Sequence, residues 1–282
     1  MLLAAPPPAS PPAFEQPAPT PTAAGEPFPV YQLQLDRELI FVGLGVAAWL
    51  AFYARDRANL PDPCPAPAGC DAQQINGLDR FAVDQHSSGA DLASDVTRAL
   101  AVAYPAALEL YMLRSGGSER RRGVLADAFV DGEVLLITSG LTSLFEQTAE
   151  RLRPSVYRQA PLPPGTQRSS DDFNSFPSGH TSSAFAAASA GCVTFVRRMR
   201  PSGRSALVAC APGFALAVAT GMLRVAAGRH FPTDVISGAA LGITVGVAVP
   251  LLHHDPRSPQ SRLVATLAPA PGGLVLHLAG RF

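Results

Sequence analysis

The sequence predicts an all-α integral membrane protein, a helical bundle of about six transmembrane helices. Composition is the first observation, since 47% of the 282 residues are hydrophobic, 16% are charged and the mean hydropathy is +0.16. This is too apolar for an ordinary soluble enzyme. Secondly, apolar segments of roughly bilayer length alternate with polar loops. Thirdly, the short loops 114–122 and 197–204 each carry four arginines, which is typical of cytoplasmic loops.

Charge and cysteine usage limit the partners and cofactors. The formal net charge is zero, whereas a protein that binds nucleic acid needs a basic surface for the phosphate backbone. We therefore expect no nucleic-acid partner. The four cysteines are too few for a disulfide scaffold and lack the spacing of a metal site. Cys64 and Cys70 could form a disulfide in an extracytoplasmic loop or remain two free thiols.

The two ends of the chain differ from its middle. The first 30 residues are dominated by Pro and Ala, which cannot build a core, so residues 1–36 are predicted to be a disordered tail. A secretory signal is disfavoured because the short apolar start has no basic region before it. Residues 37–254 form the predicted membrane domain. In the C-terminal tail, residues 255–282, the alternation over 274–278 could make one short strand.

The predicted membrane domain divides into apolar segments. The third is expected to continue as a helix to Arg153, because a residue that precedes a proline is disfavoured in helical geometry. A polar loop is expected over 155–176. The predicted spans are 39–54, 96–113, 124–145, 178–196, 206–222 and 234–252.

Two features within these spans allow alternative interpretations. Asp127, Asp131 and Glu133 on the third span could form a functional relay, but ion pairs with the neighbouring loop arginines are the simpler interpretation. In the last span, small residues recur every four positions at Gly238, Gly242 and Gly246. Such a stripe lets another backbone approach closely. Packing inside the subunit is the preferred interpretation, and a homodimer is the alternative.

Three short clusters contain residue types that handle phosphate. They are 151–154 (Arg-Leu-Arg-Pro), 177–180 (Pro-Ser-Gly-His), and Arg224 followed by 229–234 (Arg-His-Phe-Pro-Thr-Asp). Arginine offers a planar fork of donors that matches phosphate oxygens, and a Ser-Gly pair before a helix exposes backbone N–H groups to an anion. Of two histidines, one can attack phosphorus and the other can protonate a leaving oxygen.

Topology gives an independent reason to group these clusters. If the loops 114–122 and 197–204 are cytoplasmic, alternating spans place all three clusters on the opposite side of the membrane. Unrelated motif matches would have no reason to converge in this way. The sequence therefore predicts one composite site that faces the extracytoplasmic side.

The three clusters together resemble the type 2 phosphatidic acid phosphatase superfamily, which is related to the vanadium haloperoxidases. Its signature is Lys–x6–Arg–Pro, then Pro–Ser–Gly–His, then Ser–Arg–x5–His–x3–Asp. The second motif is complete here, whereas Glu146 replaces the lysine of the first and Leu223 replaces the serine of the third. The resemblance covers residues 124–252 and implies a catalytic core of the phosphatase and haloperoxidase type.

The resemblance implies a role for each matching residue. His230 would attack phosphorus to form a phosphohistidine, and Asp234, one helical turn later, would fix the imidazole tautomer. His180 would be the general acid. The residues expected to hold the phosphoryl oxygens are Arg153, Arg224, Ser178 and Gly179. No metal and no cofactor are implied, and the remaining histidines have no comparable context: His86, His253, His254 and His277.

The implied function is metal-independent hydrolysis of a lipid phosphate. The expected substrate is a monoester or diphosphate of the phosphatidic acid or polyprenyl diphosphate type, and the expected location is a bacterial inner membrane, in contact with membrane lipids. Glu146 leaves an alternative open, a weakened or inactive relative that binds lipid phosphate. A haloperoxidase-type enzyme is the third possibility, although family members of that type are soluble.

Overall fold

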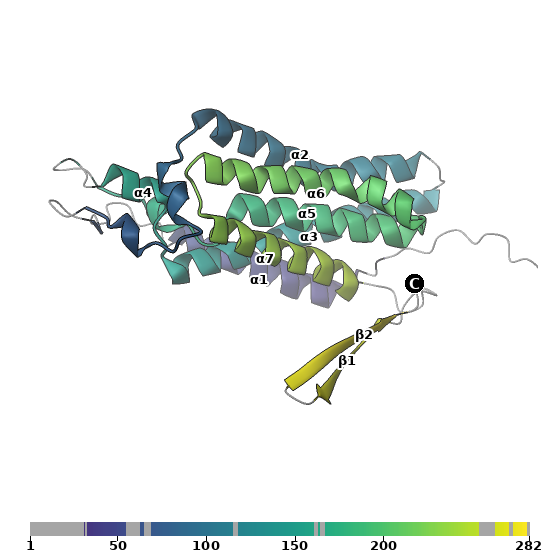
Figure 1. Cartoon of the computed structure of the whole chain (residues 1–282). Coiled ribbons are helices and arrows are strands. Elements are labelled where there is room, and N and C mark those ends of the chain that lie inside the picture. The colour runs from purple at the N-terminus through teal and green to yellow at the C-terminus, as the bar shows by residue number, and fades with distance from the viewer. Residues whose placement is uncertain are drawn as a thin grey trace, which may run out of the picture.

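A computed structural model describes residues 31, 33–54, 63–64, 69–114, 118–160, 163, 167–253, 263–270 and 273–280. Most of the predicted N-terminal tail therefore lies outside the described residues. The described part contains six long helices and a short one, arranged as a bundle (Figure 1). They are α1 (Leu35–Ala54), α2 (Ser88–Leu113), α3 (Ser118–Ala149), α4 (Pro154–Gln159), α5 (Gly179–Met199), α6 (Gly203–Ala226) and α7 (Pro232–Leu252). The predicted helical bundle is confirmed.

Helix α5 lies at the centre of the bundle, where α2, α3, α6 and α7 pack around it (Figure 1). Its sequence suits this position because Ala, Ser, Thr and Gly fill most of its buried face, and small side chains let helices approach closely. Helix α1 packs on α3. The helix that carries the Pro-Ser-Gly-His motif is thus held by four neighbours.

The glycine stripe of α7 packs against α5 of the same chain. A Cβ atom at Gly242 would lie 2.3 Å from the Ser182 carbonyl oxygen, and one at Gly246 would lie 2.3 Å from that of Ala186. Neither position can carry a side chain without moving the backbone. The preferred interpretation, packing of this stripe within the subunit, is therefore confirmed. A homodimer stays a prediction, and the stripe does not support it.

Within the described residues, α2, α6 and α7 are long and apolar enough to cross a membrane. Their outward faces carry large apolar side chains that the bundle leaves exposed, including Leu100, Val208 and Ile236. An exposed apolar surface of this extent fits contact with lipid. Helix α5 needs less apolar character because its neighbours cover it.

The chain between α3 and α5 differs from the prediction. Helix α3 ends at Ala149, four residues before Arg153, because Glu150 adopts a positive φ of 44°, a conformation that interrupts a right-handed helix. Arg153 instead becomes the N-cap of α4, with Pro154 in its first turn, where proline is favoured. A turn of 3-10 helix, η3 (Ser170–Phe173), follows in the predicted loop.

Two acids of α3 meet groups on other parts of the bundle. Asp127 accepts a hydrogen bond of 2.8 Å from Arg198 Nη2, at the end of α5. Glu133 lies 2.8 Å from His253 Nε2 and accepts no hydrogen bond from an arginine of the described residues, so the predicted ion pair was wrong for Glu133. Helix packing, and not only proximity in sequence, decides which groups meet inside a bundle.

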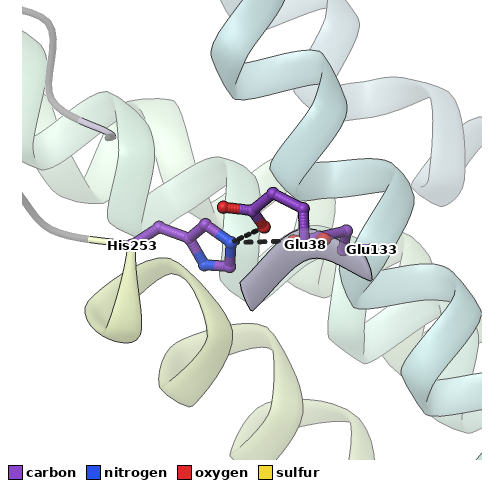
Figure 2. A group of neighbouring side chains, drawn as sticks. All are labelled: Glu38, Glu133 and His253. Atoms are coloured by element: carbon purple, nitrogen blue, oxygen red, sulfur yellow. Dashed lines mark hydrogen bonds and ion pairs between the residues drawn. The ribbon is translucent and has the colours of Figure 1, made fainter. Parts of the chain in front are cut away.

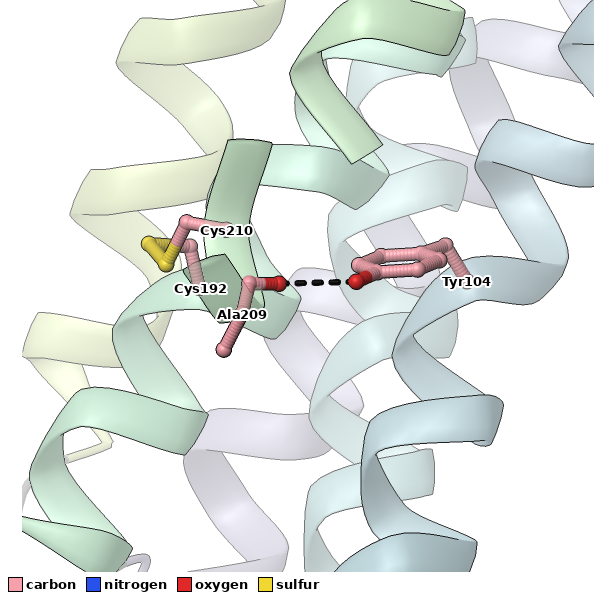
Figure 3. The surroundings of a disulfide bond; sticks show 4 residues. All are labelled: Tyr104, Cys192, Ala209 and Cys210. Atoms are coloured by element: carbon pink, nitrogen blue, oxygen red, sulfur yellow. Dashed lines mark hydrogen bonds between the residues drawn. A yellow bond between two sulfur atoms is a disulfide. The ribbon is translucent and has the colours of Figure 1, made fainter. Parts of the chain in front are cut away.

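Two disulfides join the four cysteines. Cys64 pairs with Cys70, which decides between the two alternatives for that loop. Cys192 of α5 pairs with Cys210 of α6, and close by the Tyr104 hydroxyl of α2 donates to the Ala209 carbonyl at 2.8 Å (Figure 3). This second pair was not predicted, since its members are 18 residues apart in two apolar segments.

In the C-terminal tail, the segment 274–278 does form a strand, as predicted, and a second strand that was not predicted pairs with it. The structure has an antiparallel hairpin of β1 (Leu263–Ala270) and β2 (Gly273–Gly280), in which Leu267 pairs with Leu276. An isolated strand leaves its backbone groups unpaired, and a second strand satisfies them.

Candidate active site

All three motif clusters lie at one end of the bundle. The amino ends of α2, α5 and α7 meet there with the carboxyl ends of α3 and α6, beside α4 and the 3-10 helices η1 (Ala72–Gln74) and η2 (Arg80–Asp84) (Figure 1). The clusters are linked directly, since the Ser178 amide donates to the Asp234 carbonyl and Arg153 Nη1 donates to the Arg229 carbonyl. The predicted convergence on one face is thus observed in the geometry.

His230 lies in the connection between α6 and α7, and only 1% of it is exposed. Its Nδ1 is 2.8 Å from the carbonyl oxygen of Ser175. A carbonyl oxygen can only accept, so Nδ1 carries a proton and, in the neutral ring, Nε2 keeps its lone pair. Burial, followed by the positive charges of Arg153 and Arg224, holds the pKa of His230 well below its usual value. The imidazole is therefore neutral at physiological pH.

Asp234 acts on this histidine through a neighbour. Its Oδ2 is 4.0 Å from His230 Nδ1, beyond hydrogen-bonding distance, and instead accepts from the Ser175 hydroxyl at 2.6 Å and the Phe231 amide at 2.9 Å. Ser175 thus joins the two residues, with its hydroxyl on Asp234 and its carbonyl on His230. The sequence did not indicate Ser175, which lies 55 residues before His230 and outside the motifs.

Arg151 is part of the scaffold. Its guanidinium donates to Asp234 Oδ1, to Thr233 Oγ1 at 2.7 Å and to Asp79 Oδ2 at 2.7 Å. It also lies over the ring of Phe231, 4.4 Å from the centroid, a favourable cation–π geometry. With its donors used in this way, Arg151 fixes the start of α7.

Asp79 anchors the other side of Arg151. Burial alone would raise the pKa of this carboxyl group, but hydrogen bonds from Thr233 and Arg151 lower it below its ordinary value. Asp79 is therefore charged, as a partner of a guanidinium should be. The Thr233 amide also donates to Asp79 Oδ1 at 3.0 Å, and this bond connects the start of α7 to the residue before η2, 154 residues away in sequence.

Arg153 and Arg224 are both buried, each with 6% exposed. Arg153 donates to the Asp171 carboxylate at 2.7 Å, and Arg224 donates to Asp91 of α2 at 2.8 Å. The Nε of Arg224 has no hydrogen-bond partner within the described residues. Arg229, which is 42% exposed in its side chain, shares Asp91. The buried guanidinium groups of Arg153 and Arg224 therefore act on His230, and carboxylates are their partners.

His180 lies in the first turn of α5 and remains partly open to solvent. Its Nε2 is 2.8 Å from Asp95 Oδ1 of α2. Next to it, Ser178 is the N-cap of α5, and its hydroxyl accepts from Thr181 Oγ1 at 2.9 Å. The amides of Gly179 and His180 belong to the first turn, where N–H groups lack helical partners and favour an anion.

Glu146 lies beside this helix start, in the last turn of α3. A Cβ atom built on Gly179 would be 3.8 Å from Glu146 Oε1. The carboxylate forms no ion pair with Arg151, whose guanidinium contacts Asp79 and Asp234. An acid therefore occupies the place of the family lysine, next to the amides that would meet an anion.

Part of the chain is similar to known proteins. Residues 131–258 match the model of the PAP2 superfamily. Curated relatives named lipid A 1-phosphatase include those of Porphyromonas gingivalis (42% identity over 73 residues, 26% of this chain), Rhizobium etli (35% over 109 residues, 38%) and Rhizobium johnstonii (41% over 70 residues, 25%). The aligned parts span only 15%, 42% and 24% of the lengths of these relatives.

One solved structure is similar to the chain. It is the transmembrane PAP2 type phosphatidylglycerolphosphate phosphatase from Bacillus subtilis, with 21% identity. The alignment covers 73% of this chain and 93% of that one, with a TM-score of 0.33, too low to support an inference.

Proposed function

Because residues 131–258 match the model of the PAP2 superfamily, we propose that this protein is a metal-independent membrane phosphatase that hydrolyses a lipid phosphate through a phosphohistidine. Its membrane domain would be residues 37–254. The observation that carries the proposal is the environment of His230. Its Nδ1 is fixed on the Ser175 carbonyl, so its Nε2 lone pair is kept beside buried arginines.

The proposed attack uses this lone pair. Nε2 of His230 forms a bond to phosphorus, and the bond between phosphorus and the lipid oxygen breaks. The proton comes from the imidazolium form of His180, which Asp95 and the negative phosphoryl group would stabilise, and it passes to that oxygen, so the lipid leaves as an alcohol. The positive charge that develops on His230 is stabilised by the Ser175 carbonyl, which accepts from Nδ1, and by Asp234 nearby.

The second half of the reaction regenerates both histidines. His180, now neutral, accepts a proton from water while the water oxygen attacks phosphorus and the bond to His230 Nε2 breaks. Inorganic phosphate is released. Asp95, 2.8 Å from His180 Nε2, orients the imidazole through both steps.

The arginines would stabilise the phosphoryl group through charge. Arg153 and Arg224 are buried, and charged hydrogen bonds are stronger away from water. A phosphate would replace Asp171 on Arg153 and Asp91 on Arg224, because it offers more negative charge and three acceptor oxygens. The first-turn amides of α5, at Gly179 and His180, together with the Ser178 hydroxyl, would complete the set of donors.

A lipid phosphate is the substrate class that best fits the surroundings. The site lies at the end of helices whose outer faces are apolar, so an amphiphile could keep its chains in the bilayer while its headgroup reaches His230. The relatives named lipid A 1-phosphatase favour a phosphate monoester. The cationic side chains Arg197 and Arg198 end α5 at the opposite end of the bundle, which favours an extracytoplasmic site in a bacterial inner membrane.

Glu146 supports a second candidate, a protein that binds lipid phosphate without turnover. Burial raises the pKa of Glu146 to about 8, and in its ionised form the carboxylate near Gly179 would repel a phosphoryl group. Retention of His230, His180 and both buried arginines favours activity.

Phosphate release from phosphatidic acid by the detergent-purified chain in excess EDTA tests the proposal, with a polyprenyl diphosphate and lipid A assayed in parallel. We expect release in EDTA that disappears in His230→Ala. Binding of lipid phosphate with no release from any of these substrates would favour the second candidate. Release that EDTA abolishes would contradict a metal-independent mechanism.

A further inference from the structure

A second cluster of ionisable side chains lies at the other end of the bundle. Glu38 of α1, Glu133 of α3 and His253, which follows α7, direct their polar ends toward one another (Figure 2). His253 Nε2 is 2.8 Å from Glu38 Oε2 and 2.8 Å from Glu133 Oε2. All three residues are buried. The three helices are therefore joined through one small polar site.

The histidine presents a lone pair to two carboxylates. Its Nδ1 is 2.8 Å from the Val249 carbonyl oxygen, which can only accept a hydrogen bond, so Nδ1 carries a proton. In the neutral ring, Nε2 then points a lone pair at Glu38 and Glu133. A lone pair and two negative oxygens repel one another in a buried site, so a positive species is needed between them.

Glu133 supplies an independent indication of a ligand. It is 2% exposed, and neither of its carboxylate oxygens accepts a hydrogen bond from the described residues. A buried carboxylate without donors is costly. Its Oε2 faces the histidine nitrogen at 2.8 Å and its other polar neighbour is the acid Glu38, so an ion between these groups would meet the Glu133 carboxylate.

The other two groups are held from behind, as metal ligands usually are. The Val249 carbonyl fixes the His253 ring, while Glu38 Oε1 accepts from the Gln34 amide at 2.8 Å and from Arg37 at 2.9 Å. Glu38 Oε2 remains directed at the cluster. The contacts thus fix orientation without using the coordinating atoms.

We propose that Glu38, Glu133 and His253 bind one divalent transition-metal ion, with Zn²⁺ as the best-matched species. One imidazole nitrogen and carboxylate oxygens suit zinc. Two ligand atoms that each lie about 2.0–2.2 Å from an ion are at most about 4.4 Å apart, and His253 Nε2 lies 2.8 Å from each carboxylate. The ion would offset the two carboxylates and tie α1, α3 and α7 together. Its role is structural, because His230 lies at the opposite end of α7.

The test uses the full purified chain in detergent, stripped with chelator and then desalted. We expect calorimetric titration to show one Zn²⁺ per chain and Zn²⁺ to raise the Tm by several degrees, since a ligand that binds the folded state stabilises it. Mg²⁺, which prefers oxygen ligands and water, should do neither. The described cysteines are all in disulfides, so thiols would not compete for zinc.

Glu133→Gln is the discriminating variant, since it keeps the shape of the side chain. It should weaken Zn²⁺ binding at least about tenfold and remove the Tm shift, whereas His86→Ala, at an exposed loop histidine, should leave both unchanged. Equal Zn²⁺ binding in Glu133→Gln and the unmodified chain, or no stoichiometric binding, would overturn the proposal and leave a protonated histidine as the positive group.

A second measurement applies if Glu133→Gln does not fold. Zinc X-ray absorption on the loaded, unmodified chain should show one imidazole nitrogen among oxygen ligands. A coordination shell without imidazole, or with several, would contradict the assignment. Neither result depends on phosphatase activity, so the metal site and the proposed reaction can fail separately.

Discussion

His230 and His253 flank the same helix, α7, and the backbone treats them alike. Each is buried, and each donates from Nδ1 to a carbonyl oxygen at 2.8 Å, that of Ser175 for His230 and that of Val249 for His253. Their surroundings differ in sign. Arginines surround His230, whereas two carboxylates lie 2.8 Å from Nε2 of His253.

The two histidines differ in the reaction or ligand that their surroundings favour. A carbonyl selects the tautomer in both cases and leaves the lone pair on Nε2. The charges opposite Nε2 then decide what it meets. A positive environment attracts an anion, which favours nucleophilic attack on phosphate, and a negative one attracts a cation. The same imidazole is thus suited to catalysis at one end of α7 and to ion binding at the other.

The largest expected effect comes from replacing each histidine in turn. His230→Ala should lower phosphate release by at least about 10³-fold, because the nucleophile is lost. His253→Ala should change the rate at temperatures well below its Tm by less than about threefold, because it lies far from the reacting atoms, yet it should lower the Tm. Initial rates and thermal unfolding in the same detergent check both. A comparable loss of rate in the two variants would contradict the assignment of catalysis to His230 alone.

Two arginines that share one acid test which positive charge acts on the phosphoryl group. Arg224 and Arg229 both contact Asp91, but only Arg224 is buried. Arg224→Gln should reduce kcat/KM by about 10²–10³-fold, the usual loss when a buried donor to a developing charge is removed. Arg229→Gln should cost about tenfold or less, since solvent screens an exposed charge. The reverse order would show that the phosphoryl group binds on the outer side of Asp91.

Substitutions of Glu146 test whether additional positive charge beside Gly179 increases activity. Glu146→Lys places the family cation beside Gly179, and we expect kcat/KM to rise about three- to tenfold through attraction of the phosphate. Burial raises the pKa of Glu146 to about 8, so Glu146→Gln, which keeps the shape of the side chain, should change kcat/KM little at neutral pH and should give part of the gain above pH 8. A decrease in both variants would indicate that the carboxylate itself contributes to turnover.

The smallest expected effect is on the pH dependence of the free energy of unfolding. The folded chain holds His230 neutral, whereas the unfolded chain binds a proton there below the ordinary value of 6.5. The unfolded state then binds more protons, so stability rises with pH and falls as pH drops below 6.5, by up to ~1.4 kcal/mol per pH unit from this group. Thermal unfolding of the chain and of His230→Gln between pH 7.5 and 5 should show a weaker pH dependence in the variant. Equal slopes would contradict a neutral buried His230.

Sequence reasoning located the site but not the interactions that shape it. The motif spacing and the arginine-rich loops predicted that His180, His230 and Asp234 converge at one end, and the geometry agrees. Arg151 lies in the first motif cluster, but its side chain turns to Asp79 and Asp234. Spacing records the backbone position of an arginine and not the acid that its long side chain reaches.

The acids that contact His180, Arg224 and His253 could not be predicted from the sequence, for one physical reason. Asp91 and Asp95 lie on α2, more than 80 residues before the motif residues that they contact, and Glu38 is 215 residues from His253. Only helix packing brings these groups together. The sequence contains the periodic apolar segments that build the bundle but no local pattern for pairs formed across it.

The most direct test is to look for the phosphorylated histidine itself. The chain is mixed with lipid phosphate that carries a radiolabelled phosphoryl group and is quenched within one turnover. We predict a protein-bound label that is stable in base and lost in acid, present in His253→Ala and absent in His230→Ala. A label that persists in His230→Ala, or rapid phosphate release with no label in the unmodified chain, would show that His230 is not the nucleophile.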